Sequence, residues 1–179
     1  MRKLVLILAF LLVGCNNIDV PAGACKVSEC PNITVRFSPK GGVAQAISDN
    51  ILHAQTDVYV QAFSFTSIPI SNALIEMKKA GKTVVVILDK ENVKDNRSVL
   101  ASLYSNGVPV YIDDKHAIAH NKIVIIDRHI VFTGSYNFSN AAENSNAENS
   151  IEIADGNIAQ QYLTNWQVHQ EHSYLYVAK

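Results

Sequence analysis

The sequence has no excess of basic residues. It contains 15 Lys and Arg residues against 16 Asp and Glu residues, which gives a formal charge of −1. Two of the basic residues, Arg2 and Lys3, lie in the first 14 residues, which contain no acid, so 13 basic and 16 acidic groups remain and their formal charge is −3. Because there is no global positive field, a polyanionic partner would have to be held by a local patch.

The chain also lacks internal repeats, low-complexity tracts and a second set of core-forming segments. It has 179 residues, of which 48% are hydrophobic, and this is the composition of an ordinary globular protein. These features exclude a repeat array, a fibrous protein and a disordered chain, and they predict one domain.

No apolar run is long enough to span a bilayer, which takes about 20 residues. The run at residues 4–14 follows two basic residues and ends in a glycine, which is typical of a secretory signal. Residues 12–15 (LVGC) resemble the bacterial lipobox. We therefore expect a lipoprotein signal peptide at residues 1–14, lipidation of Cys15, and a tether at residues 15–31 that anchors the domain to a membrane. A plain signal peptide with a chance cysteine is the alternative.

Cysteines are few, and export decides how they are interpreted. Cys25 and Cys30 lie in a short stretch that contains proline, in a compartment that permits disulfides. With Cys15 lipidated, the remaining count is even, which favours a small disulfide loop. A metal site is the weaker alternative, because no histidine or second cysteine pair lies nearby.

The folded domain is expected at residues 32–179, and its first half alternates strands with helices. The hydrophobic periodicity predicts strands at 33–37, 58–65, 83–89 and 108–112, and helices at 43–55, 71–80 and 93–105. A hairpin then follows, with strands at 122–127 and 130–133 around Arg128-His129, and after it a strand at 150–154 and a helix at 157–172. This order predicts an α/β fold, a mixed β-sheet flanked by helices on both faces.

The predicted hairpin carries an unusual set of polar residues. His120 and Lys122 project to the same face of an extended chain, and both would be costly in a core without partners. Ser135 and Asn137 repeat this two-residue spacing after the second strand, so antiparallel pairing brings a hydroxyl and an amide toward the imidazole and the ammonium. Gly134 permits a close approach of the backbone. These donors would surround a tetrahedral oxyanion next to one nucleophile.

The spacing His120-x-Lys122-x4-Asp127-x6-Gly134-Ser135-x-Asn137 resembles the HKD signature of the phospholipase D superfamily. Segments 62–66, 141–143 and 148–149 resemble, more narrowly, the small bacterial Nuc-type endonucleases. The likeness extends over about residues 33–170 and implies a phospholipase D/nuclease-like fold.

The resemblance also implies a mechanism. Phosphodiester cleavage in this superfamily passes through a phosphohistidine and needs one histidine as nucleophile and a second as general acid. The chain has one such motif, so we expect a homodimer in which His120 and Lys122 of both copies converge. Lys122, Asn137 and Ser135 would hold the phosphate, and the resemblance implies that no metal ion or other cofactor is needed.

Two carboxylates could support the nucleophile. Glu148 resembles the residue of this family that hydrogen-bonds the second ring nitrogen of the histidine and fixes its tautomer, whereas Glu143 lies in the same polar loop and is the alternative. Asp127 belongs to the signature, but it stands at the corner of a tight hairpin, where aspartate often caps the turn. We therefore expect Asp127 to be mainly structural and include it among the candidate site residues.

Other residues give weaker signals. His116 and His120 have the spacing of helical zinc ligands but precede a strand, so no metal site is expected there. The remaining histidines are interpreted as surface or partly buried residues. Tyr59, Phe63 and Phe65 are interpreted as core, with a platform for stacking bases as the alternative. Tyr136 and Phe138 could contact substrate or pack. Lys115 and Arg128 are expected to add positive charge near Lys122.

The sequence therefore predicts an exported enzyme, anchored as a lipoprotein on the periplasmic side of a bacterial membrane. Its first expected activity is non-specific cleavage of DNA, with RNA as a further substrate. The alternatives are a phospholipase D that hydrolyses phospholipid head groups and a non-catalytic nucleic-acid-binding protein. The formal charge of −3 argues against tight binding of a polyanion.

Overall fold

The computed structural model describes residues 31–178, which form one compact unit. The predicted signal peptide, the lipidation site Cys15, the tether and the pair Cys25 and Cys30 lie outside the described residues. Within the described residues, no helix combines the length and the hydropathy needed to cross a bilayer.

Eight strands form one mixed sheet in the order β1-β7-β6-β5-β2-β3-β4-β8. The strands are β1 (Asn32–Ser38), β2 (Asp57–Ala62), β3 (Thr83–Asp89), β4 (Val110–Asp113), β5 (Lys122–Ile126), β6 (Ile130–Gly134), β7 (Glu148–Ala154) and β8 (Tyr174–Leu175). The helices are α1 (Val43–Leu52), α2 (Ile68–Lys79), the 3₁₀ helix η1 (Lys90–Val93), α3 (Leu100–Ser105), α4 (Asn140–Asn144) and α5 (Gly156–His172). Strands β2, β3 and β4 are parallel, and every other pairing is antiparallel.

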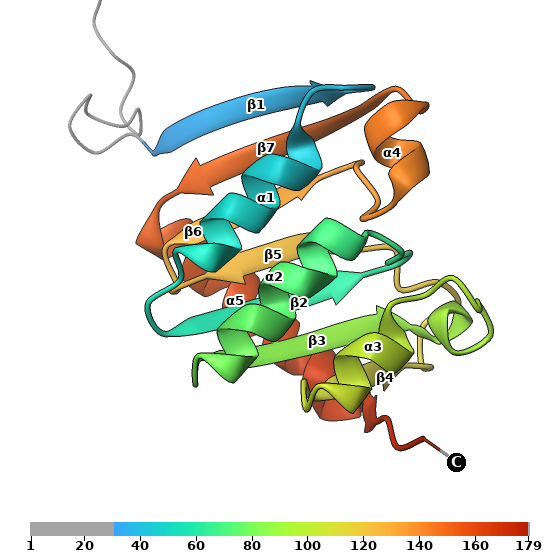
Figure 1. The fold of residues 1–179 in the computed structure, drawn as a ribbon. Helices are drawn as coiled ribbons and strands as arrows, with labels where there is room; N and C mark the ends of the chain where they lie inside the picture. Colours follow the sequence, from blue (N-terminus) through green and yellow to red (C-terminus); the bar gives the residue numbers. More distant parts are fainter. Residues whose placement is uncertain (1–30, 179) are drawn as a thin grey trace, which may run out of the picture. The chain divides into compact units, whose positions relative to one another are not determined.

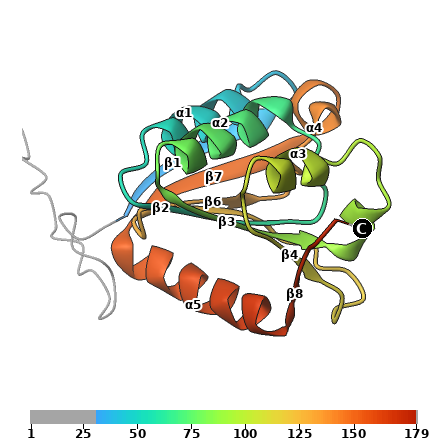
Figure 2. The same ribbon diagram turned by 60° about the horizontal axis from the view of Figure 1, so that its bottom comes forward.

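Helices cover both faces of the sheet, which confirms the predicted fold class. Helices α1, α2 and α3 lie on one face and α5 lies on the other (Figures 1 and 2). Successive side chains of a strand point to opposite faces, so Val58, Val60 and Ala62 of β2 pack toward the first group of helices. On the opposite face, Ile123 and Ile125 of β5 join the apolar side of α5.

Trp166 fixes the position of α5 on the sheet. Its side chain is 1% exposed, its ring lies 4.9 Å from that of Tyr59 between centroids, and its Nε1–H donates to the backbone oxygen of Val60 at 2.9 Å. The indole therefore contributes both apolar area and a satisfied polar group, as buried tryptophans usually do.

Several predicted boundaries were wrong for local reasons. The expected helix 93–105 is shortened to α3, because the polar turn after η1 supplies its own hydrogen bonds. Asp95 accepts from the backbone N–H of Arg97 at 2.9 Å, and Ser98 accepts from that of Leu100 at 3.3 Å. Helix α2 begins at Ile68, ahead of the expected start, since Pro69 is tolerated in a first turn. The short helix α4, capped by Ser139, and strand β8 were not expected.

Candidate active site

The candidate site lies at the edge of the sheet where β2 ends and β5 begins. Lys122, the first residue of β5, pairs with Ala62, the last residue of β2. The backbone N–H of Phe63 continues this pairing by donating to the oxygen of Asn121 at 2.9 Å. On the other side of β5, Val124 pairs with Phe132, and continuing that register brings Gly134 opposite Lys122. The hairpin thus brings together the two halves of the predicted motif.

His120 is exposed and packs against the side of a half-buried phenylalanine. Its ring lies 4.8 Å from the ring of Phe63 between centroids, at an interplanar angle of 53°. No hydrogen bond engages either ring nitrogen within residues 31–178. The imidazole is therefore positioned by packing and is free to react on its solvent side.

Phe63 is a site residue that the sequence interpretation missed. It was assigned to the core with Tyr59 and Phe65, but only Phe65 is fully buried. Phe63 contacts both members of the motif, since the Nζ of Lys122 lies 5.2 Å from the centroid of its ring. The sequence carried no signal for this role, because the strand expected at 58–65 ends at Ala62 and alternation therefore assigned Phe63 a strand face that it does not have.

Lys122 is an almost completely buried cation. The residue is 6% exposed, and its Nζ donates to the backbone oxygen of His120 at 2.7 Å. Burial lowers the pKa of the ammonium below its ordinary value, and the negative charge of Glu148 opposes this shift. A poorly hydrated ammonium beside an exposed imidazole suits a substrate that carries negative charge at the reacting centre.

Ser135 connects Glu148 to the same edge of the sheet. The Ser135 hydroxyl donates to Oε2 of Glu148 at 2.6 Å and accepts from the backbone N–H of Asn149 at 3.1 Å. The other oxygen of Glu148 accepts from Asn146 at 3.1 Å. The predicted hydrogen bond from His120 to Glu148 is not present in the part of the chain that the structure describes, so Glu148 acts here on Ser135 and on the charge of Lys122.

Asn137 has a side-chain amide that is not fully engaged. Its Oδ1 is buried and has no hydrogen-bond partner among the described residues. A buried amide costs free energy when its polar atoms lack partners. Because Oδ1 only accepts hydrogen bonds, the phosphate-binding role predicted for Asn137 would fall to its Nδ2 amino group.

Tyr136 and Phe138, the neighbours of Asn137 in the sequence, are each 2% exposed and pack in the core. Their predicted alternative role, contact with a substrate, does not match this burial.

Glu143, the alternative to Glu148, is used elsewhere. Its carboxylate accepts from the backbone N–H groups of Gly42 and Ala44, each at 3.0 Å, and from the Tyr136 hydroxyl at 2.7 Å. The carboxylate therefore caps the first turn of α1, a favourable position for a negative charge. Burial, assisted by the negative charge of Glu143, raises the pKa of Tyr136.

Asp127 does not join the other motif residues. It lies at the opposite end of β5, at the first of two positive-φ positions in the hairpin turn, with φ 51°. Its carboxylate accepts from the backbone N–H groups of Gln55, Thr56 and Asp57 at 2.8, 2.7 and 3.1 Å. This geometry corrects its inclusion in the catalytic set and fits the expected structural role. Burial raises the pKa of Asp127, but these hydrogen bonds outweigh that effect and hold it below its ordinary value.

The two cations expected to assist Lys122 do not provide free charge at the site. Arg128 lies beside Asp127 at the far end of β5 and pairs with Asp57 at 2.9 Å. Lys115 pairs with its neighbour Asp114 at 3.1 Å. Of the three cations expected at this site, Lys122 is therefore the one that the structure places next to His120. His116 does not pair with His120 either, because its ring faces Asp113.

Comparison with known proteins agrees with this geometry. Residues 47–168 match the family described as "Cardiolipin synthase, PLD-like domain". A phospholipase D of Rickettsia felis is 41% identical over 141 residues, which cover 79% of this chain and 68% of that protein. A mitochondrial cardiolipin hydrolase of Xenopus tropicalis is 29% identical over 128 residues, which cover 69% of this chain and 61% of that protein.

Solved structures show the same fold. Nuc of Salmonella typhimurium, a phospholipase D family member, has a TM-score of 0.77 and 32% identity, covering 83% of this chain and 99% of its own. NucT of Helicobacter pylori has a TM-score of 0.74 and 22% identity, covering 82% of this chain and 99% of its own. At this identity the likeness supports the fold alone. The chain thus belongs to the phospholipase D superfamily and is a phosphodiester hydrolase of that family.

Proposed function

We propose that this chain is an endonuclease that cleaves DNA, and RNA as a further substrate, through a phosphohistidine and without a metal ion in the reaction. The observation that carries the proposal is the exposed His120 imidazole beside the buried Lys122 ammonium. The surrounding groups are polar and open to solvent, with Ser135 exposed and Asn149 half-buried. Such an edge can admit one phosphate of a long hydrophilic polymer. The likeness to Nuc, at 32% identity over 99% of that chain, supports the same activity.

The reaction needs a second histidine that the same chain does not offer. All six histidines lie in the described residues, and the other five are placed elsewhere: His53 at the end of α1, His129 in the turn at the opposite end of β5, and His116, His169 and His172 around Asp113. We therefore propose a homodimer with twofold symmetry, in which the two copies bring their His120 residues to one phosphate. The pair of Lys122 ammonium groups would then supply the local positive charge that one copy lacks.

The proton and bond changes follow from this pairing. A nitrogen of one His120 attacks phosphorus, the P–N bond forms, and the bond to the leaving oxygen breaks as that oxygen takes a proton from His120 of the second copy. Water then attacks phosphorus and gives its proton to the second histidine, and the P–N bond breaks. Lys122 and Asn137 hold the non-bridging oxygens while charge develops on them.

Hydrolysis of a phospholipid head group is the second candidate. Relatives such as that of Rickettsia felis, 41% identical, are named phospholipase D. Ile118, two residues before His120, is 58% exposed and could contact an apolar chain. A lipid anchor at Cys15 would place the site beside such a substrate.

One assay separates the two candidates. Purified protein is incubated in excess EDTA with plasmid DNA, single-stranded DNA, RNA and phosphatidylcholine vesicles, alongside His120→Ala and the control His129→Ala, which removes an exposed histidine at the other end of the hairpin. We expect the wild type and the His129→Ala control to cleave DNA, and His120→Ala to leave it intact. Head-group release with intact DNA would establish the lipid activity instead.

The dimer has its own test. Sedimentation at assay concentration is expected to give twice the chain mass. Mixing wild type with excess His120→Ala should lower activity more steeply than dilution with buffer does, because a mixed dimer has only one of the two His120 side chains that the site needs. Full activity from a monomer would contradict the shared site.

We also propose that the protein is exported and held on the periplasmic side of a bacterial membrane through Cys15. The basic, apolar and LVGC segments of residues 1–15 support this proposal. Incorporation of labelled palmitate should be lost in Cys15→Ser, and labelling of both proteins or of neither would contradict it.

A further inference from the structure

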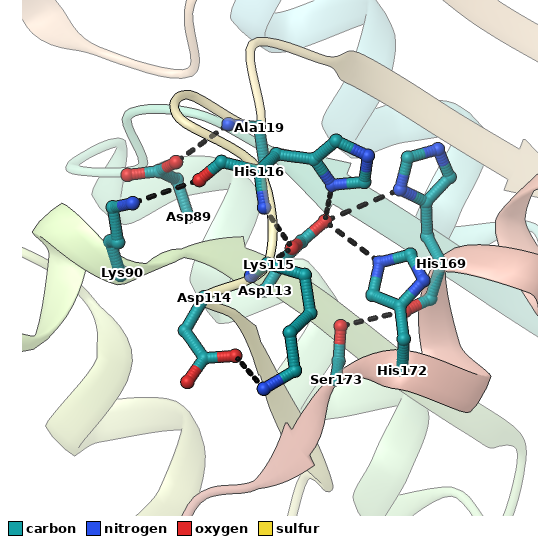
Figure 3. A network of polar contacts seen from close by, with 10 residues as sticks. All are labelled: Asp89, Lys90, Asp113, Asp114, Lys115, His116, Ala119, His169, His172 and Ser173. Atoms are coloured by element: carbon teal, nitrogen blue, oxygen red, sulfur yellow. Dashed lines mark hydrogen bonds and ion pairs between the residues drawn. The ribbon is translucent and has the colours of Figure 1, made fainter.

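Four potential metal ligands from distant parts of the chain meet on the side of the sheet that α5 covers. Asp113 is the last residue of β4, and His116 follows it in the loop that leads to β5. His169 and His172 lie in the last turn of α5. Figure 3 shows the three imidazole rings turned toward one carboxylate oxygen. No other group of three or more such ligand atoms was found within the described residues.

The distances suit a four-coordinate metal ion. Oδ2 of Asp113 lies 2.9 Å from Nδ1 of His116 and 3.3 Å from both Nδ1 of His169 and Nε2 of His172. In a tetrahedral zinc site with bonds of about 2.0–2.1 Å, neighbouring ligand atoms are about 3.3 Å apart. All four ligand atoms lie within 4.8 Å of one another. Small movements of the rings would therefore close a tetrahedron.

The carboxylate is held so that one oxygen remains directed at the histidines. Asp113 is fully buried, and its Oδ1 accepts from the backbone N–H groups of Lys115 and His116 at 3.1 and 3.3 Å. Hydrogen bonds of this kind orient the side chains that bind the ion in metal sites. The side chains of His169, His172 and His116 are 16%, 30% and 46% exposed, so an ion can enter from solvent.

We propose that Asp113, His116, His169 and His172 bind one divalent transition-metal ion of the type that prefers imidazole, with Zn²⁺ as the natural probe. Four protein ligands fill a tetrahedral site, which is the arrangement of a structural metal and leaves no position for a substrate. The ion would fasten the end of α5 to the loop between β4 and β5. That loop leads directly to His120 and is also held by the Ala119 N–H, which donates to Asp89 at 2.7 Å.

This role is separate from the proposed hydrolysis. None of the four ligands shares a hydrogen bond with His120, Lys122 or Asn137 among the described residues. Removing the ion should therefore lower the thermal stability and leave the phosphoryl chemistry in place below the melting temperature of the metal-free protein.

The test measures binding directly. The full chain is freed of metal by chelation and titrated with Co²⁺, whose visible absorption reports tetrahedral coordination, and its zinc content after Zn²⁺ loading is determined by elemental analysis. We expect one ion per chain. We also expect Zn²⁺ at about 100 times its dissociation constant to raise the melting temperature by roughly 5–10 °C.

Matched variants identify the site. His172→Gln should lose the tetrahedral Co²⁺ spectrum and the rise in melting temperature, whereas the control His129→Ala should keep both. If His172→Gln does not fold, His116→Gln replaces it, because His116 is the most exposed ligand. No bound metal in the wild type, or equal binding by the ligand variants, would overturn the proposal and leave the three histidines as hydrogen-bond donors to Asp113.

The outcome does not depend on the nuclease assay. Loss of DNA cleavage with normal Co²⁺ binding would count against the proposed function alone, and normal cleavage without metal binding would count against the metal site alone.

Discussion

The ammonium of Lys122 donates its hydrogen bond to the backbone oxygen of His120, 2.7 Å away, so the cation is held by the residue whose side chain we propose as the nucleophile. The two side chains lie on the same side of the chain, one exposed and the other buried, and Phe63 contacts both. Imidazole and ammonium are thereby fixed relative to each other before any substrate arrives. Such fixed positions spare the reorganisation that solvent would need during the reaction.

Replacing Lys122 by methionine should remove activity without lowering stability. Burial lowers the pKa of this ammonium, so its charged form is less favourable in the folded protein than in the unfolded chain. Methionine keeps an unbranched stem of similar length and has no charge. We expect DNA cleavage to fall at least about 100-fold, with a melting temperature equal to or above that of the wild type. The control is Lys79→Met at an exposed position of α2. A clear drop in melting temperature for the Lys122 variant alone would contradict the argument.

The two glutamates of the β6–β7 region should separate activity from stability. Glu148→Gln removes the charge that opposes the lowering of the Lys122 pKa. The alkaline limb of the pH–rate profile should therefore move to lower pH, and the rate should fall roughly 10–100-fold. Glu143→Gln removes the charge that caps α1, which should cost about 1–2 kcal/mol of unfolding free energy in urea and leave the pH–rate profile unchanged. Identical profiles for the two variants would show that Glu148 has no special effect on Lys122.

Asp127 should matter for stability at neutral pH and not for catalysis. Its folded pKa is held below the ordinary value by three backbone hydrogen bonds. The carboxylate therefore contributes stability above its unfolded pKa of about 3.9, and this contribution is lost as the pH falls through the folded pKa. Asp127→Asn should cost about 2 kcal/mol at pH 7, and the gap between variant and wild type should narrow below about pH 4. Urea titrations at several pH values measure this gap. A constant gap across that range would show that the charge is not the cause.

The hairpin could be predicted from the sequence because strand length, turn length and the alternation of apolar residues all lie within one short segment. Strands of five residues with a short turn leave one register that keeps the apolar side chains on buried faces, and this register brings Gly134 opposite Lys122. The motif residues alternate with the strand period, so their shared face followed directly. The same reasoning placed Asp127 at the corner of the hairpin turn, where the structure has it.

Contacts between residues distant in the sequence could not be predicted in this way. Asp113 meets His169 and His172 because α5 packs across β4 at a position fixed by Trp166 and Val60. The sequence showed only isolated histidines at the end of an amphipathic helix. Phe63 was missed for a related reason: it lies just beyond the last paired residue of its strand, where alternation no longer predicts burial.

Gly134 offers a last test, because it directly precedes Ser135 and its backbone lies against Asn149. Its φ is 141°, and a Cβ there would overlap the backbone oxygen of Asn149 and lie 2.9 Å from that residue's Oδ1. Asn149 also donates its backbone N–H to Ser135. Gly134→Ala should therefore move Ser135 and Glu148 as well as strain the chain, and we expect a loss of about 2–4 kcal/mol together with a fall in cleavage rate.

The matched control for this substitution is Gly107→Ala. Gly107 also has a positive φ, 74°, but nothing lies within 4 Å of an added Cβ, so its cost should be only that of the left-handed conformation, about 1 kcal/mol. Urea unfolding gives both free energies, and the plasmid assay gives both rates. If the two variants lost equal stability and both kept full activity, the close contact with Asn149 would have no part in shaping the site.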